Sequence, residues 1–407
     1  MQSCAMAASV LAARILGRTA FGEFGILRST IVTFGVLAGS GIGLAATKVI
    51  AEYRTVDRAR TGRIISMLMN VALVISGTAT VICILGAEPL AGGLLHAPHL
   101  VNGLRILAVL LVLSTTSGVQ IAILAGLEDF RSIAIVSGAE GVLSLVAVAL
   151  GARFFGLYGA LAGTVAAPAV MFLFKQRAVS AKCRIEGIQV TRGALREHMP
   201  FFWSHLLPAV LIGISAQPFE WFARVLLARR PDGFSAVGVF TAAYAIAQVV
   251  SFGTSQITAP AVPILANTYR LESRAAFMRL LRLVGVAMAA VTVAVALPVA
   301  VAAPWIMRIY GHGFADGGPV LATLVAGYAV SSASSFFRVV LVATGRLWSQ
   351  NLHAVICGSA LVASFAALSR FGAIGLAIAY LIAYTVVTFT QGISVLQAIA
   401  AAGGAGR

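Results

Sequence analysis

Residues 153–159 read Arg-Phe-Phe-Gly-Leu-Tyr-Gly, and residues 370–375 read Arg-Phe-Gly-Ala-Ile-Gly. Each stretch separates two long apolar segments, and Gly156 and Gly372 are 216 residues apart. A landmark that recurs at a fixed offset, between segments of the same kind, is the sequence signature of an internal repeat. The chain is therefore expected to contain two copies of one structural unit.

Three further landmark pairs occur in the same order, with offsets of 210, 213 and 219 residues. They pair residues 13–16 with 223–226, residues 24–27 with 237–240, and residues 125–126 with 344–345. Each half holds six apolar segments, so two parallel halves are expected, with pseudo-two-fold symmetry around a central cavity. The competing interpretation is that loops of any multi-span protein share scattered glycines and arginines.

The composition requires a membrane. Of the 407 residues, 60% are hydrophobic and 10% are charged, whereas a soluble domain has about 25% charged residues. One soluble core also stops growing near about 250–300 residues, so lipid must cover this apolar surface. A soluble enzyme, a disulfide-stabilised secreted protein and a disordered chain are excluded.

Apolar stretches of about 17–25 residues are typical of transmembrane helices. They predict an all-α polytopic membrane protein with about 12 transmembrane helices in two six-helix lobes. The expected spans are 2–17, 24–46, 64–86, 104–126, 132–152, 155–174, 199–223, 235–259, 282–303, 319–343, 351–369 and 373–397. The expected domains are an N-terminal lobe (1–174), a cytoplasmic basic linker (175–198) and a C-terminal lobe (199–407). The first span is short for a hydrocarbon core of about 30 Å, which leaves open a truncated or late-started gene.

The distribution of basic residues predicts the orientation. With the N-terminus in the cytoplasm, 19 of the 29 Lys and Arg residues fall on the cytoplasmic side. The positive-inside rule therefore places both termini in the cytoplasm. The formal net charge of +16 is thus first an orientation signal.

Five short motifs run along the chain: ARILG at 13–17, FGIL at 24–27, IAEYR at 50–54, LAGLEDF at 124–130 and FGLYGALAG at 155–163. With them, the chain from residue 14 to about residue 384 resembles the polysaccharide and O-antigen export flippases of the multidrug/oligosaccharidyl-lipid/polysaccharide exporter superfamily. The resemblance implies a flippase in the bacterial inner membrane that moves a lipid-linked oligosaccharide by alternating access through a cationic cavity. It also implies an undecaprenyl-type lipid-linked glycan, membrane lipid and polysaccharide polymerase machinery as partners.

Charged side chains inside a span are candidates for function, because a charge there costs about 2.5–3.5 kcal/mol on insertion scales. Arg338 is the first substrate-binding candidate, since its span is rich in serine and guanidinium binds phosphate through two hydrogen bonds. Arg28, Gln120 and Gln248 are the other candidates for the lumen. For Arg28, snorkelling to the membrane surface explains the position equally well, and the serine and threonine runs are better explained by hydrogen bonds between helices.

Three positions are candidates for coupling and gating. Glu140 lies near the middle of a span, where it either binds a coupling proton or sodium ion or pairs with an arginine of a neighbouring helix. Glu220 and Arg224 are four residues apart on one helix and are expected to pair. Arg14 occupies the place of Arg224 in the first repeat, so Arg14, Glu220 and Arg224 are gate candidates.

Other classes of site and function are disfavoured. The four cysteines form no CxxC motif, and His96 with His99 supplies only two metal ligands. No metal, no other cofactor and no nucleic-acid partner is expected. An embedded polymerase or ligase needs a sizeable catalytic outer loop, which the short connections do not provide. The alternative that remains is a multidrug or small-solute exporter of the same superfamily or of the major-facilitator type. The glycan, the coupling ion and the oligomeric state stay open.

Overall fold

The computed structural model describes residues 2–39, 42–191, 215, 217–271, 274–343 and 349–404. All regular structure within these ranges is helical. The chain divides into two compact units, Met1–Gln217 and Pro218–Arg407.

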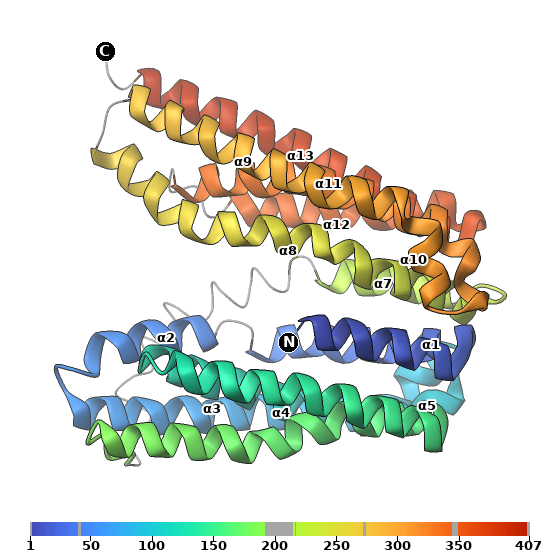
Figure 1. Cartoon of the computed structure of the whole chain (residues 1–407), viewed down its shortest axis with the longest axis horizontal. Helices are drawn as coiled ribbons and strands as arrows, with labels where there is room; N and C mark the ends of the chain where they lie inside the picture. The colour runs from blue at the N-terminus through green and yellow to red at the C-terminus, as the bar shows by residue number, and fades with distance from the viewer. Residues whose placement is uncertain are drawn as a thin grey trace. The chain divides into compact units, whose positions relative to one another are not determined.

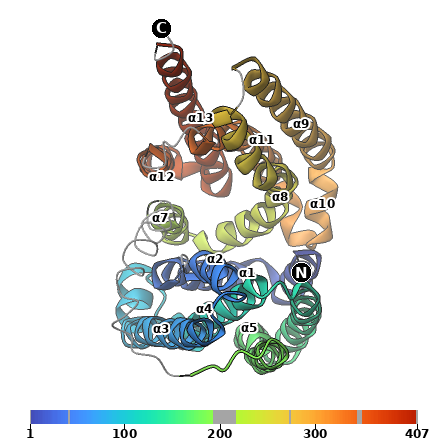
Figure 2. The ribbon, with the colours of Figure 1, turned by 90° about the vertical axis from the view of Figure 1, so that its left-hand side faces the viewer.

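In the first unit, α4 (Val101–Gly126) packs against all four of the other long helices. These are α1 (Gln2–Gly39), α2 (Ile42–Tyr53), α3 (Arg58–Leu85) and α5 (Phe130–Ile185), drawn in blue to green in Figure 1 and seen nearly end-on in Figure 2. Two short helical elements, η1 (Pro89–Leu94) and η2 (Pro98–Leu100), connect α3 to α4. Leucines on the inner faces of α4 are completely buried, which identifies it as the core helix of this unit.

In the second unit, α11 (Gly318–Ala343) has the corresponding central place. It packs against α8 (Gly233–Leu271), α9 (Arg274–Val301), α10 (Ala303–Ile309) and α13 (Gly372–Gly404). The remaining elements are α7 (Gln217–Ala228), η4 (His312–Gly317), α12 (Ser349–Leu368) and η5 (Ser369–Phe371) (Figure 1). Both units are thus built around one buried apolar helix with others packed around it.

The repeat landmark is a backbone bend with the same geometry in both units. Gly156 has φ 58° and ψ −139°, and Gly372 has φ 58° and ψ −131°. Only glycine adopts this region without strain, since it has no Cβ. Gly17, with φ 75° and ψ 176°, produces a third bend of this kind inside α1. The two glycines matched in the sequence therefore perform the same local task.

These bends explain how the helices correspond to the expected spans. Eight segments of the described residues are long and apolar enough to cross a membrane. Three of them, Cys4–Val36, Phe130–Ile185 and Ser349–Gln397, each cover two expected spans, so eleven of the twelve spans lie in described helices. The span expected at 199–223 lies mostly outside the described residues. The expectation of an all-α, multi-pass membrane protein is confirmed.

The expected start of the basic linker needs correction, and the end of that linker lies outside the described residues. The basic linker was expected to begin at residue 175, but α5 continues as a helix to Ile185. Basic residues in its last turns, such as Lys182, interrupt the apolar pattern without interrupting the helix, because lysine and arginine are good helix formers. Residues 192–198 of the expected linker lie outside the described part of the chain.

Asp129 starts α5 as its N-cap. Its carboxylate accepts a hydrogen bond of 3.1 Å from the backbone N–H of Ser132, which satisfies one of the free N–H groups at the helix start. Burial by itself raises the pKa of Asp129. The hydrogen bonds from Ser132 and the charges of Lys182 and Arg131 outweigh it, so the pKa lies below its ordinary value.

Candidate functional site

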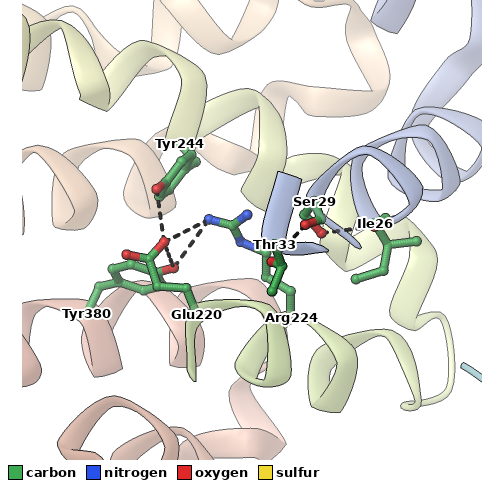
Figure 3. A network of polar contacts seen from close by, with 7 residues as sticks. All are labelled: Ile26, Ser29, Thr33, Glu220, Arg224, Tyr244 and Tyr380. Atoms are coloured by element: carbon green, nitrogen blue, oxygen red, sulfur yellow. Dashed lines mark hydrogen bonds and ion pairs between the residues drawn. The ribbon is translucent and has the colours of Figure 1, made fainter. Parts of the chain in front are cut away.

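Four helices of the second unit bring together a carboxylate, a guanidinium and four phenol rings. Glu220 and Arg224 come from α7 and Tyr244 from α8, while Tyr328 belongs to α11 and Tyr380 with Tyr384 to α13. We call these six residues the tyrosine cluster. It contains four of the eight tyrosines in the chain, and Figure 3 shows Glu220 between Tyr244 and Tyr380.

One carboxylate oxygen is the centre of the hydrogen bonding. Glu220 Oε2 accepts hydrogen bonds from the hydroxyls of Tyr244 and Tyr380, both at 3.1 Å. Arg224 Nη2 donates to the same oxygen at 3.2 Å and to the Tyr380 hydroxyl at 3.4 Å (Figure 3). The expected pairing of Glu220 with Arg224 is confirmed.

The aromatic rings enclose this charge pair. The Arg224 guanidinium carbon lies 4.5 Å from the ring centre of Tyr244, a cation–π distance. The ring centre of Tyr328 lies 5.9 Å from that of Tyr244 and 5.6 Å from that of Tyr384. The Glu220 and Arg224 side chains are 23% and 15% exposed. The cluster therefore holds a pre-organised ion pair whose carboxylate accepts hydrogen bonds from three donors.

The serine and threonine runs expected to face water or other helices mostly bond within their own helix. Ser29 donates to the carbonyl of Ile26 and Thr33 to that of Ser29, both at 2.9 Å (Figure 3). Thr30 also donates to the carbonyl of Ile26, at 2.8 Å. Ser334, which donates to Gln391 at 2.8 Å, is an exception that links α11 to α13. Hydroxyls that donate to the preceding turn have used their one hydrogen, so they are available to a ligand only as acceptors.

Glu140 forms a buried ion pair in the first unit. Its Oε2 lies 2.6 Å from Nζ of Lys175, and the two side chains are 10% and 3% exposed. Both residues belong to α5, one on each side of the bend at Gly156. The expected arginine partner is thus a lysine that the sequence placed in a loop, because α5 is longer than its apolar stretch. Of the two roles open for Glu140, this contact favours the structural one.

Gln120 is also buried in the first unit. It is 0% exposed, and its Nε2 donates to Gln176 Oε1 at 3.0 Å and to the Phe172 carbonyl at 3.3 Å. A side chain with this environment joins α4 to α5 and does not face a lumen. The expected substrate-binding role of Gln120 therefore finds no support in its position.

The other expected site residues lie on surfaces of their own units. Arg28, Gln248, Arg14 and Arg338 are all exposed. Arg338 donates to Ser335 at 3.2 Å, and it lies five residues, about 8 Å, before the end of α11. Arg28 lies about 16 Å along the helix from the bend at Gly17 and has no ion-pair partner among the described residues. Arg28 therefore lies farther from the described ends of its helical segment than Arg338 does.

His96 and His99, the two histidines considered as metal ligands, have the following surroundings. His99 Nε2 lies 2.8 Å from Glu23 Oε1, and His96 adopts a positive φ of 52°. Within the described ranges no group of three His, Cys, Asp or Glu side chains is arranged to hold a metal ion.

Sequence reasoning missed the four tyrosines and a buried histidine, His353. Tyrosines in membrane proteins are enriched at the two interfaces, whereas these four lie eight to twelve residues from the nearer ends of their helices. Tyrosines so far inside apolar segments, two of them spaced i and i+4 at Tyr380 and Tyr384, were the signal available. Hydropathy scores alone hide it, because tyrosine is only mildly polar.

Comparisons with known proteins concern sequence and fold. A family described as "Polysaccharide biosynthesis protein" matches residues 4–269. A sequence comparison with curated proteins finds no match.

Among solved structures, an inward-facing multidrug resistance MATE family transporter of the MOP superfamily is similar, with a TM-score of 0.87 and 16% identity over 98% of this chain and 95% of that one. The lipid II flippase MurJ, in an inward closed conformation, has a TM-score of 0.76 and 13% identity over 97% and 85%. An outward-facing MATE transporter has a TM-score of 0.66 and 18% identity over 98% and 94%. The chain thus has the two-lobed fold of these proteins.

Proposed function

Because the chain belongs to the polysaccharide biosynthesis protein family, we propose that it moves a lipid-linked oligosaccharide across the membrane by alternating access. The family match confirms the resemblance that the short motifs indicated. The cargo is an amphiphile with a polyprenyl tail, a diphosphate and a glycan head. The fold of the lipid II flippase MurJ, to which this chain is similar, supports a cargo of that shape.

The proposal rests on which of the charged side chains inside the spans have a partner of opposite charge. Glu140 and Glu220 both have a basic partner within 3.2 Å, whereas Arg28 is exposed and has no ion-pair partner among the described residues. A guanidinium deep in a helix without a counter-charge attracts an anion, and it binds phosphate oxygens through two parallel hydrogen bonds. We assign the binding of the cargo's diphosphate to Arg28, with Arg338 nearer the end of its own helix.

Export of cationic drugs is the competing function, because the chain also has the fold of MATE transporters. A cation exporter needs an acidic side chain that is available to its substrate. In the tyrosine cluster, three hydrogen bonds and the positive charge of Arg224 already satisfy Glu220. This arrangement weakens the attraction that a drug cation would feel and favours the anionic cargo.

The experiment uses the full chain in liposomes that contain a polyprenyl-diphosphate oligosaccharide with a fluorescent tail. Flipping is measured as the change in glycan accessible to a membrane-impermeant lectin. Arg28→Ala is expected to lose flipping, since the diphosphate loses its guanidinium partner. Arg105→Ala is the matched control, because Arg105 pairs with Glu88 in an exposed ion pair at 2.8 Å.

Two results would contradict the proposal. Full flipping by the Arg28→Ala variant removes the assigned binding role. Transport of a cationic dye by the same liposomes, without any lectin-detected flipping by the wild type, identifies a drug exporter instead.

We further propose that the protein resides in the bacterial inner membrane with both termini in the cytoplasm, and that a polysaccharide polymerase consumes its product. A cysteine introduced at Asp57 is then expected to react with an impermeant maleimide only from the cytoplasmic side. A cysteine introduced at Asp232 is expected to react from the opposite side. Reversed labelling would invert the topology.

A further inference from the structure

His353 is a buried titratable group that the proposed function has not used. It lies in the second turn of α12 and is 3% exposed. Its ring nitrogen Nε2 lies 3.2 Å from the hydroxyl of Ser394 on α13. An ionisable side chain within a membrane span is rare and is a functional-site candidate by default.

The hydrogen bonds of Ser394 determine where the imidazole carries its proton. A serine hydroxyl has one hydrogen to donate, and Ser394 donates it to the carbonyl of Thr390 at 3.1 Å. The hydroxyl oxygen must therefore accept from His353, so Nε2 carries the hydrogen in the neutral ring. Nδ1 is then the nitrogen with the free lone pair.

Nδ1 of His353 is buried and has no hydrogen-bond partner among the described residues. Two more buried polar atoms in the same stretch of α12, Gln350 Nε2 and Asn351 Oδ1, also have none there. Buried polar groups are almost always hydrogen-bonded, so each exception calls for an explanation. Three such atoms lie within four residues, Gln350 to His353, of α12.

A row of polar side chains leads along α13 from His353 toward the tyrosine cluster. Ser394 contacts His353, Gln391 accepts from Ser334, and Thr388 donates to the carbonyl of Tyr384 at 2.6 Å. The same face continues to Tyr384 and Tyr380, the latter bonded to Glu220. From Tyr380 to Ser394 the helix rises about 21 Å, which is most of the thickness of a hydrocarbon core.

Packing joins α12 to the helix that carries Glu220. Phe219 of α7 packs directly against Gly358, five residues after His353 on α12. Besides His353, the titratable and charged groups on α12, α13 and α7 are Cys357, Tyr380, Tyr384, Glu220 and Arg224, with Arg370 in η5 beyond the far end of α12. Among the described residues His353 has no ion-pair partner.

We propose that His353 is a proton-binding site and that proton uptake there is coupled to the transport cycle; the coupling part of this inference rests on the proposed function. The proton binds to the Nδ1 lone pair, and the imidazole becomes an imidazolium with a hydrogen on each nitrogen. Release returns the same proton from Nδ1 to water.

Proton binding is tested without any transport. The full chain, labelled with ¹⁵N-histidine in lipid nanodiscs, contains six histidines, and His353→Gln identifies the signal of His353. We expect that signal to change from a neutral ring with hydrogen on Nε2 to an imidazolium between pH 8 and pH 5. Ser394→Ala is expected to shift its midpoint, whereas His312→Gln, at an exposed outer-loop position, is not. An unchanged His353 signal over this range overturns the proposal.

Coupling is tested in the flipping assay with an imposed pH gradient. The gradient is expected to accelerate flipping by the wild type and by His312→Gln, and His353→Gln is expected to lose this acceleration while still binding the glycolipid. Flipping by the wild type that ignores the gradient overturns the coupling and leaves the flippase intact. A wild type that titrates at His353 but flips nothing refutes the proposed function and retains the proton site.

Discussion

Replacing Lys175 by methionine tests whether the buried pair in α5 is structural. The ammonium and the Glu140 carboxylate lie 2.6 Å apart, with 3% and 10% exposure. At an effective dielectric constant of about 20, their attraction is about 6 kcal/mol. Desolvation of the two ions costs several kcal/mol each, so the net value of the pair is small.

Removing one partner is different, because it leaves the other charge buried alone. Lys175→Met and Glu140→Met are each expected to lower the free energy of unfolding by about 3–5 kcal/mol. The double variant, with two apolar residues of similar volume, is expected to lie within about 1 kcal/mol of the wild type. Lys182→Met is the matched control on the same helix, since its pair with Glu186 is 2.9 Å long and 23% exposed on both sides. That variant should lose less than about 1 kcal/mol.

The measurement is reversible unfolding of the full chain in mixed detergent micelles, followed by circular dichroism. Equal losses in Lys175→Met and Lys182→Met would refute the reasoning, as would a double variant whose loss is the sum of its singles. The flipping assay separates the two roles of Glu140. A stable double variant that still flips assigns the pair to structure, and a stable one that does not flip restores Glu140 as a coupling site.

Three further outcomes follow from local geometry. Gly156→Ala and Gly372→Ala are each expected to cost about 1–3 kcal/mol in thermal unfolding, because both glycines have a backbone conformation closed to alanine; two unaffected variants would contradict the shared bend. Asp129→Ala is expected to cost about 1 kcal/mol through the lost cap. Since the pKa of Asp129 is lower in the folded state than in the unfolded one, its stabilisation is present above about pH 4 and disappears as the pH falls through the folded pKa, so unfolding curves of variant and wild type should converge in acid. Glu220→Gln should be more stable than Glu220→Ala, because the amide oxygen can still accept from two tyrosines while both variants leave Arg224 without its counter-charge; the reverse order would exclude these hydrogen bonds as the source of stability.

Much of the fold was predictable because its signals are local. Apolar stretches predicted the eleven spans that lie in described helices, and two matched glycines predicted the internal repeat. The i, i+4 spacing predicted the pairing of Glu220 with Arg224. The end of α5 was mispredicted because basic residues interrupt hydropathy without interrupting a helix. The tyrosine cluster, with members from α7 to α13, was not predictable because no local pattern encodes which helix faces meet.

The sequence by itself determined the solvent, the helical class, the repeat and the family, since burial in lipid and backbone bends depend on residues close together in the chain. Only the tertiary structure decided which polar groups are satisfied and which are free. It gave Glu140 a lysine partner, buried Gln120 between helices, placed Arg28 farther from its helix ends than Arg338 and left Nδ1 of His353 without a partner among the described residues. The physical reason is that the cost of a polar group in a membrane depends on its partner, and those partners come from distant parts of the chain.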